Sequence, residues 1–295
     1  MPTDASPAVI LVTLPIAPFN VTQYAMKDRN RIISAGNITM DLQLEGKTAL
    51  VTGASRGIGE GTAKVLAQDG VKCVVSARRM ELLENLADKI ESTGGVRPIP
   101  ISTDLFQPGA TAKLAKDAED ALGRVDILVN SAGRSKNPEA PKNLPYDYPS
   151  KKWDEEMYLN YGAIREITYA LIPGMTERKF GRVINITGKS EPEQPRTANP
   201  PKAAVHAWAK GLSRKVANDG ITINCIPPGK IVSEQILRNY SKKEREAYES
   251  YDITLGYFGV PEDIGHLIAY LSSPLAAQIT GTVIPVDGGF RKHIF

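Results

Sequence analysis

Three glycines with the spacing Gly-x-x-x-Gly-x-Gly stand at Gly53, Gly57 and Gly59. They follow an apolar run at 48–51 and open a segment of helical composition at 60–68. A strand that turns on glycines into a helix leaves the first N–H groups of that helix without intrahelical partners, and these groups and the helix dipole attract an anion. Glycine also permits a positive φ and a close approach of backbone to phosphate. The spacing therefore predicts a site for the pyrophosphate of a dinucleotide.

The elements that must position this loop alternate along the rest of the chain. Short β-branched runs predict seven strands, at 47–52, 71–76, 96–101, 125–130, 181–187, 221–225 and 282–286. Helical segments lie near 58–69, 80–92, 108–122, 151–178, 201–217 and 262–272, and the segments 134–150 and 228–260 are expected to be irregular. Continuous apolar strands separated by helices predict a parallel sheet covered on both faces. We therefore predict an α/β fold, a single Rossmann-type doubly wound domain of seven strands over 41–295.

Residues 1–40 show no clear hydrophobic period and are expected to form a flexible N-terminal extension or an upstream mis-start. The net charge of +3 is too small and dispersed to indicate nucleic-acid binding. Two cysteines in apolar runs predict buried, inert thiols of a reducing cytosol. No apolar stretch is long enough to cross a bilayer, and the apolar run 7–19 lacks the basic region of a signal peptide. We expect a cytoplasmic protein that acts on a small molecule and not on nucleic acid or membrane.

Further motifs follow the glycine loop in a fixed order. They are Asn130-Ser131-Ala132-Gly133, Asn160, Lys202, Pro228-Gly229 and Val286-Asp287-Gly288-Gly289. Together with 52–59 they resemble the short-chain dehydrogenase/reductase family, and in particular members similar to 3-oxoacyl-carrier-protein reductases, over residues from about 41 to 290. The resemblance implies an NAD(P)-dependent oxidoreductase, in which a hydride passes between the nicotinamide and a carbonyl or alcohol.

The resemblance also implies where the cofactor is held. Asp104 and Leu105 would close over the adenine, and the motif that begins at Asn130 would line the ribose side, although Asn130 could instead tie neighbouring strands together. The end of the cofactor that carries the nicotinamide carboxamide would meet Pro228, Gly229 and Ser233. The expected cofactor-binding residues are Gly53, Ser55, Arg56, Gly57, Ile58, Gly59, Arg78, Asp104, Leu105, Asn130, Ala132, Gly133, Lys202, Pro228, Gly229 and Ser233.

The end of the second strand bears on the choice of cofactor. A cofactor without a 2′-phosphate usually calls for an acidic residue there, but this chain has Ala77 followed by Arg78. Arg56 lies in the glycine loop, and two guanidiniums that converge suit a phosphate dianion. The alternative is that both arginines are solvated charges at helix ends. We expect NADP(H) to be favoured over NAD(H).

The catalytic set of the family is incomplete in this chain. The resemblance implies a Ser and a Tyr-x-x-x-Lys, in which the Tyr protonates the substrate oxygen, the Lys holds the ribose, and an upstream Asn completes a proton relay. Lys202 and Asn160 match this set, but Ala198 stands four residues before Lys202 and Gly188 stands at the Ser position. Lys202 and Asn160 therefore stay catalytic candidates, and the site is atypical because its proton donor must come from elsewhere.

Replacement donors are expected in the loop that follows Gly188. Lys189 could donate a proton or bind a carboxylate, and Ser190 could take the role of the missing Ser. Glu191 and Glu193 could form an acid/base pair. Each of these side chains could equally be a solvated loop residue. Three other candidates, Tyr158, Tyr161 and His206, are expected to pack in helices.

Basic residues crowd the expected mouth of the site, which indicates an anionic substrate such as a carboxylate or a phosphate-bearing carrier, unless they are ordinary surface charges. They are Arg134, Lys136, Lys189, Arg196 and Lys230. No metal site is expected. We favour an NADP(H)-dependent oxidoreductase with a non-standard proton donor, acting on a small carbonyl or alcohol. A catalytically silent NADP-binding sensor or assembly partner, and a non-redox lyase or isomerase on the same fold, remain alternatives.

The resemblance further implies a homodimer or homotetramer. The helices at 151–178 and 201–217 would pair with a twofold mate and bury residues such as Trp208 and Leu212. An apolar helix face is better hidden in an isologous interface than exposed to water.

The arginine pair generates a first testable prediction. Arg78→Ala should weaken NADPH binding by about 1.5–3 kcal/mol, the loss expected for a charged hydrogen bond, and should leave NADH binding nearly unchanged. Titration calorimetry with both cofactors on the wild type and the variant measures this. Equal affinities of the wild type for NADPH and NADH would contradict the expected preference.

Overall fold

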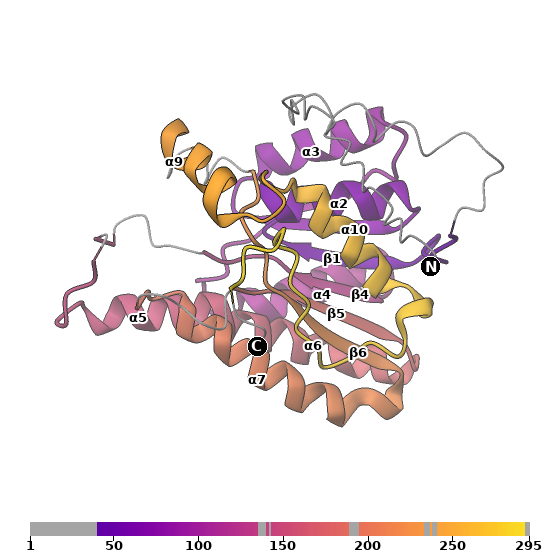
Figure 1. The fold of residues 1–295 in the computed structure, drawn as a ribbon. Coiled ribbons are helices and arrows are strands. Elements are labelled where there is room, and N and C mark those ends of the chain that lie inside the picture. The colour runs from indigo at the N-terminus through magenta and orange to yellow at the C-terminus, as the bar shows by residue number, and fades with distance from the viewer. Residues whose placement is uncertain are drawn as a thin grey trace, which may run out of the picture. The chain divides into compact units, whose positions relative to one another are not determined.

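The computed structural model describes residues 40–134, 140–141, 143–188, 195–232, 237 and 241–292. Residues Leu42–Phe295 belong to one compact unit. Its sheet has six strands in the order β3-β2-β1-β4-β5-β6, and all neighbouring strands run parallel (Figure 1). The strands are β1 (Thr48–Thr52), β2 (Lys72–Ala77), β3 (Ile99–Ser102), β4 (Ile127–Asn130), β5 (Gly181–Ile186) and β6 (Ile221–Ile226). The prediction of a doubly wound parallel α/β sheet is confirmed.

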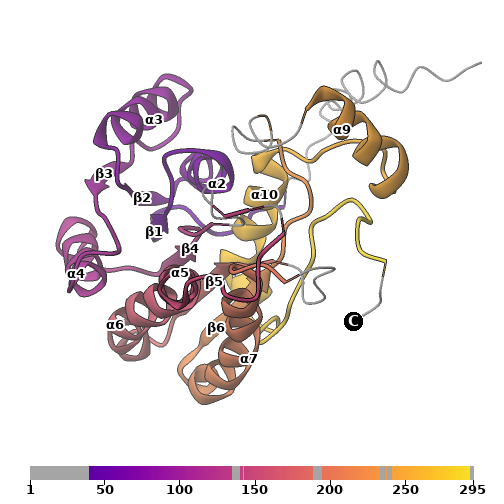
Figure 2. The same cartoon turned by 90° about the vertical axis from the view of Figure 1, so that its left-hand side faces the viewer.

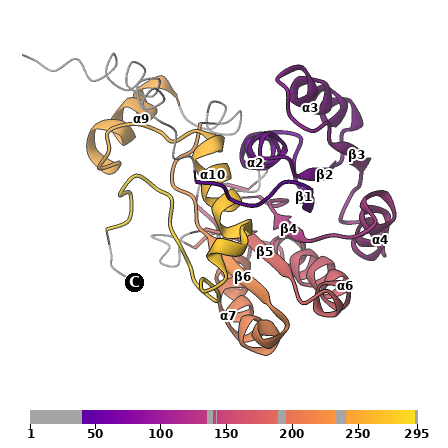
Figure 3. The ribbon, with the colours of Figure 1, turned by 90° about the vertical axis from the view of Figure 1, so that its right-hand side faces the viewer.

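Helices cover both faces of this sheet, as Figures 2 and 3 show from opposite sides. One layer holds α2 (Gly57–Gln68), α3 (Met80–Ser92) and α10 (Pro261–Ser272). The other holds α4 (Ala110–Leu122), α6 (Ala163–Glu177) and α7 (Asn199–Val216). Within β1, Ala49 and Val51 pack under the first layer and Leu50 under the second. Both faces of the strands are therefore buried, which is why the strands read as continuous apolar runs.

The predicted seventh strand at 282–286 is wrong. This segment follows the edge of the sheet beside β6, but it makes isolated parallel bridges only, Cys225↔Val283 and Pro228↔Val286. The amides of Cys225, Ile284, Val286 and Gly229 do donate across this edge, but Pro227 has no N–H for the bond that would lie between them. A continuous ladder therefore cannot form along this edge, although the chain follows the course of a strand.

The predicted long helix at 151–178 is three successive elements. These are α5 (Ser150–Met157), a π-helical turn η1 (Tyr158–Gly162) and α6. Single π-turns of this kind interrupt α-helices most often at functional positions, and this one contains Asn160. Within the segment that was expected to be irregular, a short helix α9 (Lys242–Ala247) forms behind a capping box made by Ser241 and Glu244.

The interface expected from the family resemblance needs a correction. Leu212 is already buried within the chain, at 8% exposure, so it adds little to any contact between subunits. Trp208 packs edge-on against Tyr161 and Tyr169 at centroid distances of 6.1 and 6.0 Å, and its indole N–H donates to the Tyr169 hydroxyl at 3.1 Å. Tyr169 remains 48% exposed and keeps an aromatic surface there. The assembly itself stays a prediction.

No helix among the described residues is long and apolar enough to cross a membrane.

The turn from β1 into α2 is packed without room for side chains. Gly53 has a φ of +67°, and a Cβ there would lie 2.7 Å from the Cα of Ala132. A Cβ on Gly59 would lie 2.5 Å from the carbonyl oxygen of Gly53. Both glycines are therefore required by backbone contacts, one of them across to the end of β4 and the other between α2 and its own strand.

These contacts predict the effect of adding one methyl group. Gly59→Ala should lower the free energy of unfolding by about 1–3 kcal/mol, because the backbone of the loop has to move to admit the methyl. Gly211→Ala is the matched control, since its Cβ would meet nothing within 4 Å on α7. That variant should gain about 0.5–1 kcal/mol from helix propensity. Urea unfolding of both variants measures the difference, and an equal stability of both would contradict the packing argument.

Candidate active site

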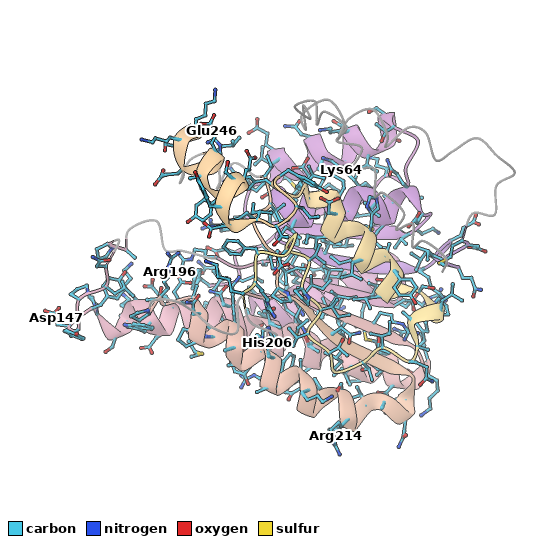
Figure 4. The ribbon with its side chains drawn as sticks, viewed as in Figure 1. Lys64, Asp147, Arg196, His206, Arg214 and Glu246 are labelled. Atoms are coloured by element: carbon cyan, nitrogen blue, oxygen red, sulfur yellow. The ribbon has the colours of Figure 1, made fainter. Side chains whose placement is uncertain are left out.

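The candidate active site lies at the carboxyl ends of the strands, where α2 leaves β1 toward one face and the chain after β4 turns to the other. This reversal of direction between β1 and β4 is the place where open α/β sheets bind ligands. The connections that follow all six strands can contribute here, because the strands run parallel and end at the same edge of the sheet. Figure 4 shows His206, from α7, near the centre of the molecule beside the strands, whereas Arg214 of the same helix points outward at the opposite end.

The start of α2 is open to an anion. Its N-cap residue, Arg56, has extended backbone and makes no side-chain capping bond to the first turn. Thr52 holds the loop to the end of β4, because its hydroxyl accepts hydrogen bonds from the amides of Ser131 and Ala132, both at 3.1 Å. The amide of Ala54 donates to the carbonyl of Ser76 in β2 at 3.1 Å. The first N–H groups of α2 are thus held rigidly toward the edge of the sheet, as a pyrophosphate site needs.

The residues expected around the adenine and the 2′-position follow β2 and β3. Thr52 of β1 is in register with Ser76 of β2, so Arg56 and Arg78 leave the sheet from adjacent strand ends. The carbonyl of Arg78 accepts from the hydroxyl of Ser102 at 3.0 Å, which joins β2 to β3. Asp104 closes a turn by accepting from the amide of Phe106 at 3.2 Å. Leu105, at 8% exposure, packs beneath that turn.

Asn130 ties neighbouring strands together, which was the alternative to its expected role beside the cofactor. Its side-chain amide donates to the Asn185 side chain at 2.9 Å and to the Thr168 hydroxyl at 3.3 Å. It thereby ties β4 to β5 and to α6. Its side-chain oxygen is buried and makes no hydrogen bond. A role of Asn130 in binding the cofactor stays a prediction.

Asn160 belongs to a buried ionic cluster. Its side-chain oxygen accepts from the amide of Arg134 at 3.1 Å, and its amide nitrogen donates to the carboxylate of Glu156 at 2.8 Å. Glu156 is fully buried, and its other oxygen lies 3.2 Å from the Nε of Arg134. Burial raises the pKa of Glu156, while Arg134, the hydrogen bond from Asn160 and the charge of Lys202 act in the opposite direction.

Lys202 and His206 both contact Thr187 at the end of β5. The ammonium of Lys202 donates to the carbonyl of Thr187 at 3.2 Å, and the Nε2 of His206 lies 2.8 Å from the Thr187 hydroxyl. Burial lowers the pKa of Lys202 to about 8, and the carboxylate of Glu156 opposes that shift. Burial also lowers the pKa of His206, with further lowering from the charges of Arg291 and Lys202. Both bases are thus poised to lose a proton more easily than free lysine and histidine.

The nicotinamide end of the expected site is built by two segments that pack backbone against backbone. The amide of Gly229 donates to the carbonyl of Val286 at 2.9 Å. A Cβ on Gly229 would lie 2.5 Å from the Cα of Asp287, so glycine is required there. Pro228 makes an isolated bridge with Val286. The Val286-Asp287-Gly288-Gly289 motif therefore supports the wall that Pro228 and Gly229 form.

Two of the basic residues expected at the mouth are already engaged within the chain. Arg134 faces Glu156 and lies 5.7 Å from the centroid of the Phe106 ring. The ammonium of Lys230 lies over the Tyr248 ring at 4.1 Å and near the Phe290 ring at 5.6 Å. Both residues are partly exposed and have a partner within the chain. Arg196, just before α7, is exposed.

Several predicted residues lie outside the described part of the chain. They are Lys136, Lys189, Ser190, Glu191, Glu193 and Ser233. The proposed donors Lys189 and Ser190 therefore stay predictions. Of the flanking positions, Ala198 is buried at the N-cap of α7, and a Cβ on Gly188 would lie 3.0 Å from the Cδ of Lys202.

The sequence reasoning missed Glu156. The sequence did contain a signal for a contact between Glu156 and Asn160, because the two residues are four apart and share a helix face. Glu156 also follows Glu155 in a segment rich in charge, which is typical of a solvated surface. Tyr158 and Tyr161 do pack as expected, Tyr158 with its hydroxyl 3.0 Å from Glu166.

Comparison with known proteins agrees with this geometry. A family model described as Enoyl-(Acyl carrier protein) reductase matches residues 53–291. The chain is 32% identical to the 3-oxoacyl-[acyl-carrier-protein] reductase FabG of Vibrio cholerae serotype O1, over 84% of this chain and 98% of that protein. It is 34% identical to Nodulation protein G of Rhizobium sp. (strain N33), again over 84% and 98% of the two chains.

Two solved structures are similar as well. YwfH, an NADPH-dependent reductase involved in bacilysin biosynthesis, has a TM-score of 0.75 at 27% identity, over 84% of this chain and 99% of that one. A 7α-hydroxysteroid dehydrogenase complexed with NADH and 7-oxo glycochenodeoxycholic acid has a TM-score of 0.78 at 27% identity, over 88% and 100%. The chain belongs to the short-chain dehydrogenase/reductase family. As a member of that family it is an NAD(P)-dependent oxidoreductase, as the motifs predicted.

The partly buried position of Lys202 predicts a pH dependence of stability. The unfolded chain holds the proton of Lys202 up to about pH 10.5, but the folded chain releases it near pH 8. The folded state therefore gains stability as the pH rises from about 8 to about 10.5, and this contribution is lost again as the pH falls from 10.5 to about 8. Relative to Lys202→Met, the wild type should gain about 3 kcal/mol across the window.

Urea unfolding at several pH values measures this difference. Lys215→Met is the control, because Lys215 is exposed on the same helix and its loss should leave the pH dependence unchanged. Parallel curves for the wild type and Lys202→Met would show that Lys202 keeps an ordinary pKa.

Proposed function

We propose that this chain is an NADP(H)-dependent oxidoreductase that interconverts a small carbonyl compound and its alcohol, with a non-standard proton donor. The observation that carries this proposal is the position of Lys202. Its ammonium is held at the end of β5 and its pKa is lowered to about 8, while neighbouring Gly188 and Ala198 offer no hydroxyl. Lys202 is the donor candidate among the described residues, and Lys189 and Ser190 in the adjacent loop are further candidates.

The residues at the strand ends fit a dinucleotide. The uncapped start of α2 and the close contacts of Gly53 and Gly59 suit a pyrophosphate, and Arg56 and Arg78 suit a 2′-phosphate. When bound, the nicotinamide supplies or accepts the hydride. The similar structures carry either NADPH or NADH in their descriptions, so the preference for NADP(H) rests on Ala77 and the arginines of this chain.

Proton transfer falls to the chain itself. A general acid works best when its pKa lies near the working pH, and Lys202 meets that condition better than an ordinary lysine. Its hydrogen bond to the carbonyl of Thr187 fixes the direction of the ammonium. In reduction, Lys202 would give a proton to the substrate oxygen as hydride arrives at the carbon, and in oxidation it would take that proton back.

The substrate class is proposed more broadly than the cofactor. The relatives include 3-oxoacyl-[acyl-carrier-protein] reductases, so a 3-oxoacyl thioester is one candidate. A carboxylate or phosphate-bearing carrier remains a second, now supported within the described part by Arg196, because Arg134 and Lys230 have partners inside the chain.

A catalytically silent NADP-binding protein is the second candidate function. It is favoured by one observation, the absence of both family hydroxyls at Gly188 and Ala198. This alternative expects cofactor binding without turnover, and so it differs from the main proposal in a measurable way. A lyase or isomerase would turn over substrate without a change in NADPH absorbance.

Single-turnover oxidation of NADPH tests the proposal. Stopped-flow absorbance should show turnover with at least one member of a panel of 3-oxoacyl thioesters, keto acids, quinones and activated alkenes. Lys202→Met should reduce the rate by about 10²–10⁴-fold, the contribution of one general acid. Lys215→Met should react like the wild type.

The double variant Gly188→Ser/Ala198→Tyr separates a rebuilt site from a damaged one. A phenol introduced beside Lys202 would occupy the space of the native substrate, so activity on that substrate should fall. A gain of general carbonyl reductase activity would instead show that the site had only lost its Tyr. Unchanged NADPH binding with no turnover in any variant would support the silent protein.

A further inference from the structure

His206 is a titratable residue at the carboxyl ends of the strands to which the mechanism so far gives no role. Other buried ionisable groups of the described residues are explained by their immediate partners at the opposite end of the sheet. Asp126, before β4, is ion-paired, and Arg182, near the start of β5, donates to main-chain carbonyls. His206 instead contacts Thr187, the residue whose carbonyl also binds Lys202.

All three polar groups of Thr187 are engaged. Its amide donates to the carbonyl of Ile226 at 3.0 Å, which continues the pairing of β5 with β6 by one residue. Its carbonyl accepts from the Lys202 ammonium at 3.2 Å, and its hydroxyl lies 2.8 Å from the Nε2 of His206. Thr187 is 1% exposed. The end of β5 is therefore fixed by the sheet on one side and by two side chains of α7 on the other.

The spacing of Lys202 and His206 explains how one helix can bind both groups of Thr187. The two residues are four apart on α7 and so project from the same face of the helix. Burial, followed by the charges of Arg291 and Lys202, lowers the pKa of His206 and favours its neutral form. A neutral imidazole nitrogen either donates or accepts, and a hydroxyl can do both, so the contact with Thr187 is satisfied in either tautomer.

The side chain of Lys202 lies against the next residue, Gly188. A Cβ on Gly188 would lie 3.0 Å from the Cδ and 3.9 Å from the Cβ of Lys202. The aliphatic part of Lys202 can therefore lie along the main chain of Gly188, with its ammonium at Thr187. Since Gly188 and Ala198 offer no hydroxyl, the carbonyl of Thr187 is what fixes the ammonium within the described part of the chain.

We propose that Thr187 and His206 are positioning residues of the reaction: His206 holds the hydroxyl of Thr187, and the carbonyl of Thr187 directs the Lys202 ammonium toward the substrate oxygen. This rests on the proposed function, since it assigns Lys202 a proton to give. Thr187 and His206 act through Lys202, and the proton moves only between Lys202 and the substrate oxygen.

Two other roles of His206 would give different results. A histidine that only fills space could be replaced by another ring with an effect on stability alone, and the orientation of Lys202 would not change. A histidine that itself transfers protons could not be replaced by any side chain that does not ionise. The positioning role requires only a hydrogen-bonding group at the place of Nε2.

The test uses paired variants of the full chain. Thr187→Val removes the hydroxyl and keeps the carbonyl, whereas Thr187→Ser keeps both. His206→Phe keeps a ring and removes the hydrogen bond, whereas His206→Gln carries an amide that can reach the hydroxyl but cannot ionise. His266→Phe is the matched control, because His266 is an exposed histidine on α10.

The first readout is the order parameter of the Lys202 side chain, measured by NMR relaxation of protein labelled at the lysine side chains, with Lys202→Met to assign the signal. It should fall in Thr187→Val and in His206→Phe, and it should be retained in Thr187→Ser, His206→Gln and His266→Phe. An unchanged order parameter in Thr187→Val and His206→Phe would overturn the proposal. Thr187→Val is the smaller change, and it decides alone if His206→Phe does not fold.

The second readout is the rate of single-turnover NADPH oxidation at saturating substrate, with the compound of the panel that reacts. Misdirection of the donor should lower this rate by about 10–100-fold in Thr187→Val and His206→Phe, with a smaller change in the Kd for NADPH. Thr187→Ser and His206→Gln should restore most of the rate. A His206→Gln variant as slow as His206→Phe would overturn the positioning role, because it would show that the imidazole itself must ionise.

The two proposals fail separately. A wild type without turnover would contradict the proposed function and leave the order parameter of Lys202 to decide on Thr187 and His206. Normal turnover with unchanged rates in Thr187→Val and His206→Phe would remove the role of these two residues alone.

Discussion

The contact between the first turn of α2 and the end of β1 constrains the rest of the structure. Gly59 approaches the carbonyl of Gly53 so closely that no Cβ fits between them. Gly53 likewise lies too close to the backbone of Ala132 to carry a Cβ. The helix can then begin directly at the edge of the sheet, with its free N–H groups facing outward. The hydroxyl of Thr52 extends this packing to the end of β4 through two hydrogen bonds. The anion site and the connection after β4 are thus one rigid body.

The candidate site holds a buried ion pair and lacks the hydroxyl groups that the family resemblance implies. Where the family resemblance implies a Ser and a Tyr, this chain has Gly188 and Ala198. Close to the same place it carries Arg134 and Glu156, which are ion-paired within the protein. Hydroxyls can be lost from a site without a folding penalty, but buried charges persist only when they are paired. Arg134 and Glu156 are therefore retained as a pair at this end of the sheet.

Most of the fold could be predicted because its signals are local. Each of the six observed strands overlaps a predicted one, since apolar runs between helices are legible along the chain. The predicted strand at 282–286 failed because Pro227, on the segment that faces it, lacks a donor, and the apolar pattern of 282–286 cannot show that. The π-turn at 158–162 has no local signal in the sequence that predicts it.

The candidate site was predictable only in part, and for a physical reason. The glycine loop, Asn160 and Lys202 are set by spacing, which the sequence displays. Glu156 lies 3.2 Å from Arg134, which comes from a loop more than twenty residues earlier, and its spacing of four residues from Asn160 was the one local signal for it. Long-range pairing of this kind becomes visible only in three dimensions.

Two aromatic rings contact Lys230, and one of them, Phe290, comes from the C-terminal segment. Tyr248 and Phe290 meet edge-on at 6.3 Å, with the ammonium of Lys230 over the first ring. Thr254 adds a hydrogen bond to the carbonyl of Gly289 at 2.9 Å, so the segment that carries α9 is fastened to the chain's last described turn. The last described turn of the chain is thus connected, through Phe290 and Lys230, to the neighbouring Gly229, which the family resemblance places in the cofactor site.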